Sequence, residues 1–119
     1  MFERGPRTTR RHASAASVLK TEAHRRNDRN LFHHLAALYV RCLDRLSDAA
    51  VTYQSHLIDD EARKGQMLTE YASILCALGR RQDAIEIWQS VVHLPLPATS
   101  GEFYFRGFAH YRLGNETTR

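Results

Sequence analysis

The fold is decided by residues 65–97, GQMLTEYASILCALGRRQDAIEIWQSVVHLPLP, because this stretch holds two apolar stripes at helical spacing. The first stripe ends at Leu78 and is followed by Gly79, since glycine takes the left-handed conformation at a helix end without strain. The second stripe starts near Ala84 and stops before Pro95, because a proline removes a backbone donor and restricts the residue before it. Two amphipathic helices joined by so short a turn predict an antiparallel helical hairpin.

The hairpin pattern recurs along the chain at an offset of 35 residues. The matching positions carry small or aromatic residues: Ala37, Ala72 and Gly107; Ala49 and Ala84; Tyr53 and Trp88. One hairpin cannot bury both of its faces, so a recurring hairpin predicts a stack. We therefore expect an all-α fold in which residues 30–119 form repeats at about 30–64, 65–99 and 100–119, the last one incomplete.

The small residue in the first helix, the glycine at the turn and the step from Ala84 to Trp88 resemble the tetratricopeptide repeat family. The resemblance covers about residues 30–119, and it departs from the family pattern where Asp44 replaces the turn glycine and where His33 replaces a large apolar residue. It implies a superhelix of stacked antiparallel hairpins. In that family the first helix of each hairpin lines a concave groove that accepts a peptide or a helix.

The resemblance places groove-facing side chains on the first helices of the three repeats. They are His34, Thr69 and Tyr104; Leu38, Ser73 and Phe108; Arg41, Cys76 and Tyr111; with Cys42 and Arg112 beside them. The set lacks the lysine and asparagine with which some family members clamp a terminal carboxylate, so an amphipathic helix is the expected ligand. We expect part of this set to pack inside the repeats.

The third repeat opens with an aromatic helix and stops before a second helix. Thr99 and Glu102 have capping-box spacing, and the helix that follows is expected to end at Leu113 and Gly114. Its rings are Phe103, Tyr104, Phe105, Phe108 and Tyr111. Uncovered aromatic rings predict an interaction surface for another protein or for a second copy of this chain.

Residues 1–29 carry the positive charge. They hold eight Lys and Arg against three Asp and Glu, a net charge of +5; the whole chain has +4, so residues 30–119 sum to −1. Three interpretations stay open: a flexible solvated arm, an anchor on nucleic acid or anionic lipid, and an organelle-targeting segment rich in Arg, Ser and Ala. The candidate contacts of an anchor are Arg4, Arg7, Arg10, Arg11, Arg25 and Arg26.

No catalytic constellation is present, so we expect no enzyme, no cofactor and no bound metal. Cys42 and Cys76 form no CxxC pair, and the seven histidines show no zinc-binding spacing. Residues 59–61 are all acidic but lack the alternation and glycine of a calcium loop, so they predict a solvated turn. The chain has no Gly-rich phosphate loop, no nucleophile elbow and no apolar run of about 18 residues, so no transmembrane segment is expected.

These patterns predict a non-enzymatic protein-binding module in the cytoplasm, acting as an adaptor, a chaperone or an assembly subunit. One alternative is a subunit of an organellar or ribonucleoprotein complex, docked through the arginine-rich tail, with a mitochondrial or other organelle interior as its compartment. Another is a small chaperone similar to those of type III secretion, which shield a hydrophobic helix of their partner.

Overall fold

The computed structural model describes residues 6–95 and 99–117, and all regular secondary structure in those ranges is helical. The predicted all-α class is therefore confirmed. The chain forms two compact units, Met1–Leu57 and Ile58–Arg119. None of the described helices combines the length and the hydropathy needed to cross a membrane.

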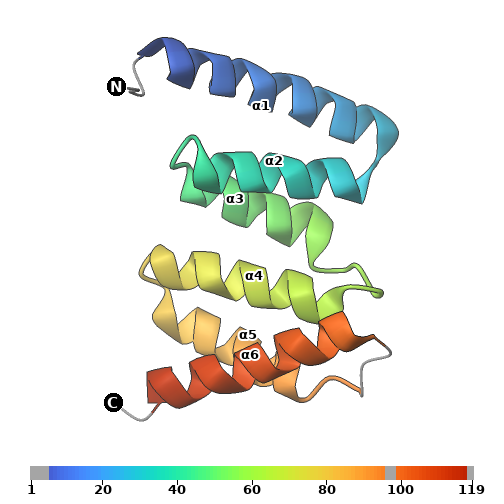
Figure 1. Cartoon of the computed structure of the whole chain (residues 1–119), viewed down its shortest axis with the longest axis vertical. Helices are drawn as coiled ribbons and strands as arrows, with labels where there is room; N and C mark the ends of the chain where they lie inside the picture. Colours follow the sequence, from blue (N-terminus) through green and yellow to red (C-terminus); the bar gives the residue numbers. More distant parts are fainter. Residues whose placement is uncertain (1–5, 96–98, 118–119) are drawn as a thin grey trace. The chain divides into compact units, whose positions relative to one another are not determined.

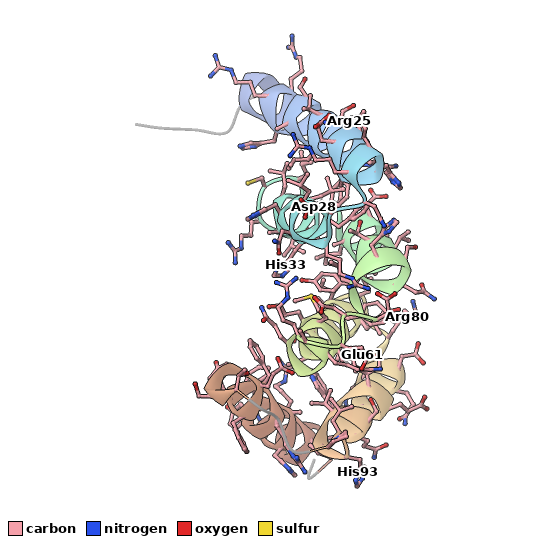
Figure 2. All side chains as sticks on the ribbon, turned by 90° about the vertical axis from the view of Figure 1, so that its right-hand side faces the viewer. Arg25, Asp28, His33, Glu61, Arg80 and His93 are labelled. Atoms are coloured by element: carbon pink, nitrogen blue, oxygen red, sulfur yellow. The ribbon has the colours of Figure 1, made fainter. Side chains whose placement is uncertain are left out.

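The first unit contains α1 (Pro6–Arg26), α2 (Arg29–Arg41), α3 (Leu46–Thr52) and a π-helical turn, η1 (Tyr53–Leu57). Helix α2 packs against the other three elements, and α1 and α2 run in opposite directions (Figure 1). The chain reverses between them at Asn27, whose φ is 50°. Asp28 follows at the junction (Figure 2), and its carboxylate accepts hydrogen bonds from the backbone N–H of Asn30 (2.9 Å) and Leu31 (3.4 Å). Asp28 thus caps α2 by satisfying donors that a helix start leaves unpaired.

Residues 6–26 are helical and pack against α2, which differs from the flexible arm that the composition suggested. The packed face holds small residues at helical spacing, since Ala16 is 3% exposed and Ala23 is fully buried. His12 and Leu19 lie on the same face and are half-buried. Alanines give a weak hydrophobic signal in a sequence, yet they fit a close contact between two helices, which explains why this face was not recognised.

Three aromatic rings join α1, α2 and η1. The rings of Phe32 and His56 stack at a centroid distance of 3.7 Å and an angle of 4°. His24 from α1 meets both rings edge-on, at 5.0 Å from Phe32 and 5.1 Å from His56. The π-helical turn η1 thus contributes the His56 ring to this cluster.

The second unit contains α4 (Lys64–Ala77), α5 (Arg81–Val92) and α6 (Ser100–Thr117), and each of these helices packs against the other two (Figure 1). Its fully buried large side chains are Met67, Thr69, Leu75, Trp88 and Val91. Helix α6 continues through Gly114 to Thr117, so its expected end at Leu113 and Gly114 is wrong. Gly79 is the one described glycine with a positive φ, and Gly114 therefore remains helical.

The offset of 35 residues appears in where the helices begin. Helix α4 begins 35 residues after α2, at Lys64 against Arg29, and α5 begins 35 residues after α3, at Arg81 against Leu46. The second helices also share their buried positions: Ala49 and Ala84 are both fully buried, and Tyr53 and Trp88 are 5% and 0% exposed. Each second helix begins at an equivalent ion pair, Arg45–Asp48 at 2.6 Å and Arg80–Asp83 at 2.9 Å.

The third helix of the series departs from this register. Helix α6 begins 36 residues after α4, at Ser100 against Lys64. Gly107 is exposed, and a Cβ added there would meet nothing within 4 Å, whereas Ala72 is fully buried. Gly107 therefore matches Ala72 in the 35-residue pattern but not in burial, because α6 turns a different face toward its neighbours.

The turn inside each hairpin holds a residue in the left-handed region. Gly79 has a φ of 85°, and Asp44, at the equivalent position 35 residues earlier, has a φ of 52°. Aspartate is among the few non-glycine residues that adopt this conformation with a modest penalty. Asp44 thus takes the conformation of the glycine that it replaces in the repeat pattern.

Two glycine substitutions should shift stability in opposite directions. Gly79→Ala should lower the free energy of unfolding by about 1 kcal/mol, because a Cβ is strained at positive φ. Gly107→Ala should raise it by up to about 1 kcal/mol, because alanine is the better residue in the interior of an exposed helix. Neither added Cβ meets an atom within 4 Å, so backbone conformation alone decides the sign of each change in the free energy of unfolding. Urea titrations followed by circular dichroism measure both changes. Equal signs for the two variants would contradict the assigned turn.

Candidate functional site

The exposed face of α6 carries a line of aromatic rings. Tyr104, Phe108 and Tyr111 occupy positions i, i+4 and i+7, which lie on one side of a helix. Their ring centroids are 6.4 Å apart between Tyr104 and Phe108 and 6.2 Å apart between Phe108 and Tyr111. Tyr104 is 64% exposed and Tyr111 is 63% exposed, so the two outer rings present most of their surface to solvent. We call these three residues the α6 aromatic stripe.

Arg112 fixes the stripe to the rest of the second unit. Its guanidinium carbon lies 4.5 Å from the ring centroid of Trp88 on α5 and 5.8 Å from that of Phe108. One of its nitrogens, Nη2, donates to Sγ of Cys76 on α4 at 3.7 Å. A guanidinium over an aromatic face is favourable, and more so when both groups are partly removed from water. Arg112 is therefore a structural contact between α4, α5 and α6.

Two buried polar atoms next to this region have no hydrogen-bond partner among the described residues: Oγ1 of Thr69 and Nε1 of Trp88. Thr69 is 2% exposed and Trp88 is fully buried. An unpaired buried donor or acceptor reduces stability by roughly 1–3 kcal/mol. Thr69 thus lies in the core, and it does not present its side chain to a groove.

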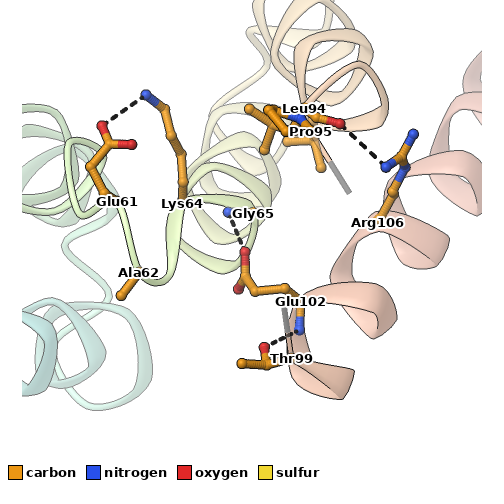
Figure 3. A pocket seen from close by; sticks show the side chains of 10 residues that line it. Glu61, Ala62, Lys64, Gly65, Leu94, Pro95, Thr99, Glu102 and Arg106 are labelled. Atoms are coloured by element: carbon orange, nitrogen blue, oxygen red, sulfur yellow. Dashed lines mark hydrogen bonds and ion pairs between the residues drawn. The ribbon is translucent and has the colours of Figure 1, made fainter. Parts of the chain in front are cut away.

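The first turn of α6 is tied to the first turn of α4. The backbone N–H of Glu102 donates to Oγ1 of Thr99 at 3.2 Å, which is one half of the predicted capping box. The Glu102 carboxylate accepts from the backbone N–H of Gly65 at 2.7 Å and of Gln66 at 3.2 Å (Figure 3). It therefore caps α4, a helix 37 residues away, and places a negative charge at a helix N-terminus, where such a charge is favourable.

A cavity of about 380 Å³ lies beside this contact (Figure 3). The charged side chains that line it are occupied within the same unit: Lys64 pairs with Glu61 at 3.6 Å, and Arg106 donates to the carbonyl oxygen of Leu94 at 3.2 Å. Glu102 is bound to α4 as described. The charged side chains of the cavity are thus already used by contacts within the second unit. The aromatic stripe is therefore the better candidate for a site.

The residues that the sequence predicted for a groove fall in both units. In the first unit, His34, Leu38 and Arg41 share one side of α2, and Cys42 follows as its C-cap. In the second, the structure brings Cys76, Phe108 and Arg112 together, with Ser73 half-buried one turn before Cys76 on α4. The exposed members of the whole set are His34, Arg41, Tyr104 and Tyr111.

Five of the six predicted tail contacts belong to α1. Arg10, Arg11, Arg25 and Arg26 are exposed there. Arg4 lies outside the described residues, and Arg7 belongs to α1 but its side chain lies outside them.

Sequence reasoning missed two contacts of this region. Trp88 was expected as a core ring, yet it also serves as the platform for Arg112. Glu102 was expected to cap its own helix, yet its carboxylate reaches α4. The spacing of Phe108 and Arg112, four residues apart, was a usable signal for an aromatic and a cation on one helix face. No local pattern indicates the partner of Glu102.

The acidic residues 59–61 form part of a turn. Oxygens of Asp60 accept from the backbone N–H of Ala62 at 3.1 Å and from Nε of Arg63 at 3.0 Å. Burial raises the pKa of Asp60, but the hydrogen bonds and the charge of Arg63 outweigh that effect and hold the pKa below its ordinary value. Within the described ranges, no three His, Cys, Asp or Glu side chains lie close enough together to hold a metal ion.

No protein-family model, curated protein or solved structure matches the chain. Its function is therefore inferred from its own residues and their geometry.

Replacing Arg112 should be visible in the fluorescence of Trp88, which is the only tryptophan in the chain. Arg112→Ala uncovers the indole ring, so the emission maximum should move to longer wavelength and the free energy of unfolding should fall by about 1 kcal/mol. Arg112→Lys should restore only part of the original emission maximum and only part of the lost free energy of unfolding. The reason is that an ammonium lacks the planar face that stacks on a ring. An unchanged emission spectrum in Arg112→Ala would rule out this contact.

Removing the Glu102 carboxylate should destabilise the second unit. Glu102→Ala leaves two N–H groups of α4 without their acceptor and should lower the free energy of unfolding by about 1–2 kcal/mol. The control is Glu86→Ala, because Glu86 is exposed on α5 and its replacement removes the same charge. Chemical denaturation of both variants measures the difference, and equal losses would mean that the cap adds no stability.

Proposed function

We propose that this protein is a non-enzymatic binding module whose α6 aromatic stripe receives an amphipathic helix from a partner protein. One observation carries the proposal: Tyr104 and Tyr111 are 64% and 63% exposed on a single face of α6. Exposed aromatic side chains in a line are unusual on a soluble surface and are typical of binding faces.

The stripe suits binding because its base is rigid. Phe108 is half-buried between the two tyrosines, and Arg112 contacts Phe108 on one side and buried Trp88 on the other. A surface that is already ordered loses little conformational entropy when it binds. Tyrosine adds a large apolar ring with a hydroxyl that hydrogen-bonds at the edge of an interface.

The chemistry of the stripe defines the ligand. Three rings spaced i, i+4 and i+7 complement a helix whose apolar residues recur at the same spacing. A buried aromatic ring covers roughly 150–250 Å², so the exposed parts of Tyr104, Phe108 and Tyr111 offer far less than the roughly 800 Å² per partner of a standard interface. This limited area favours a single helix or peptide with a few anchor residues over a stable dimer of this chain.

The resemblance to tetratricopeptide repeats supports the same proposal. In that family the first helix of each repeat lines the groove, and in the sequence pattern of this chain those first helices correspond to α2, α4 and α6. Under this interpretation the protein is an adaptor, a chaperone or an assembly subunit, with the cytoplasm as its compartment. Cys76 and Ser73 would form the floor of the binding face on α4.

Binding should depend on the two exposed tyrosines. In Tyr104→Ser/Tyr111→Ser, the affinity for helical peptides selected from a random 20-residue display library should fall at least about 30-fold, because central aromatic anchors contribute about 2 kcal/mol or more. Fluorescence anisotropy with the labelled peptides measures the loss.

The control is Phe103→Ser. Phe103 is 53% exposed but lies one position from Tyr104, on a different side of the helix. It should retain affinity within about threefold. Selection of no peptide, or equal losses in Phe103→Ser and the tyrosine variant, would refute the stripe as a binding face. Sedimentation velocity of the same proteins tests the self-association alternative.

A further inference from the structure

Helix α1 carries a net positive charge that the rest of the chain does not. Between Pro6 and Arg26 it contains five arginines and one lysine, and Glu22 is its one acidic residue, which gives a net charge of +5. The full chain has a net charge of +4, so the remaining residues together sum to −1. Charge on this chain is thus concentrated on one helix of about 31 Å, given a rise of about 1.5 Å for each residue.

The cations of α1 whose side chains the structure describes are exposed. Ala16 and Ala23 form the buried side of the helix, and Arg10, Arg11 and Lys20 are all exposed. None of these three cations forms an ion pair within the described part of the chain. No negative charge of a described residue therefore compensates them.

The C-terminal end of the helix is different. The Glu22 carboxylate pairs with Nε of Arg25 at 2.8 Å and with Nε of Arg26 at 3.1 Å. The hydrogen bond from Arg25 is the largest of the effects that lower the pKa of Glu22 to about 2, so Glu22 stays ionised at neutral pH. One negative charge thus offsets part of the Arg25–Arg26 pair, and the uncompensated charge lies at Arg10 and Arg11.

The composition of the outer face argues against a membrane as the partner. Helices that bind a bilayer surface insert large apolar residues opposite their basic face. Among the described side chains of α1, Val18 is the exposed large apolar residue, at 65%. Leu19 is half-buried on the face that packs against α2. Without an apolar face to insert, α1 has only electrostatic attraction to offer a lipid surface.

The same face suits phosphate groups. Arginine and lysine contact phosphates, and the exposed hydroxyl-bearing residues Ser14 and Ser17 add further donors between the two ends of the helix. No Phe, Tyr, Trp, Asn or Gln occurs between Arg10 and Arg26. The two histidines of this range are in contact with the rest of the first unit, since His12 is half-buried on the packed face and the His24 ring meets Phe32 and His56. The exposed arginines, lysine and serines of α1 are side chains that commonly contact a phosphate backbone.

We propose that α1 is a docking surface for the phosphate backbone of a nucleic-acid duplex, bound without sequence preference. A duplex presents phosphates in regular rows along which a straight, basic helix makes several contacts at once. This surface is separate from the α6 aromatic stripe, so the proposal holds or fails independently of the peptide-binding function.

The experiment measures binding of the full chain to a fluorescein-labelled 20-base-pair DNA duplex at several salt concentrations. Two double variants remove equal charge, Arg10→Gln/Arg11→Gln on α1 and Arg80→Gln/Arg81→Gln at the start of α5. Glutamine keeps the helix propensity of arginine. In Arg10→Gln/Arg11→Gln the slope of log affinity against log salt should flatten by about 1.8, and affinity at 50 mM salt should fall about tenfold. In the α5 variant the salt slope and the affinity should both stay within about twofold of those of the original protein. The original protein should bind a second duplex of unrelated sequence equally well.

Three results would overturn the proposal. The first is an equal loss in both double variants, which would mean that net charge and not α1 governs binding. The second is a salt slope that Arg10→Gln/Arg11→Gln leaves unchanged. The third is absent duplex binding together with α1-dependent binding to vesicles of seven parts phosphatidylcholine and three parts phosphatidylserine, which would assign the surface to lipid. Circular dichroism of all variants verifies that the helices are retained.

Discussion

Both hairpins depend on a chain reversal through a residue held in the left-handed region, Asp44 in the first unit and Gly79 in the second. The reversal fixes the direction of the second helix, and so it decides which face of that helix is buried. Ala49 and Ala84 are fully buried as a result, with Tyr53 and Trp88 one turn further along. Since Trp88 supports Arg112, and Arg112 contacts Phe108, the position of the exposed tyrosines traces back to the turn at Gly79.

The periodic features were predictable from the sequence because the same spacing of apolar and small residues recurs along the chain. The two apolar stripes of residues 65–97 predicted α4 and α5, and the 35-residue offset predicted where α2 and α3 begin. Thr99 was a usable start signal for α6 because its hydroxyl accepts from the N–H three residues later. These features follow from residues within a few positions of one another, which a sequence displays directly.

Features that depend on distant residues were not predictable in the same way. The small-residue face of α1 becomes meaningful only beside α2, and the Glu102 carboxylate finds its donors on α4. Gly107 matched the repeat by position, but α6 is rotated so that this position faces solvent. For the site, the exposed tyrosines followed from the pattern, whereas the burial of Thr69 and the place of Arg112 over Trp88 required tertiary contacts.

The short sequence distance between packed helices has a consequence for how the chain folds during synthesis. Within each unit, helices that are neighbours in sequence pack against each other, and the Glu102–Gly65 contact joins residues 37 positions apart. Contacts this local require little loop closure, which is characteristic of fast-folding helical proteins. The elements of the first unit are all encoded before residue 58, so that unit can form on the ribosome before α4 to α6 are translated. Helix α6 is translated after α4 and α5, the two helices against which it packs.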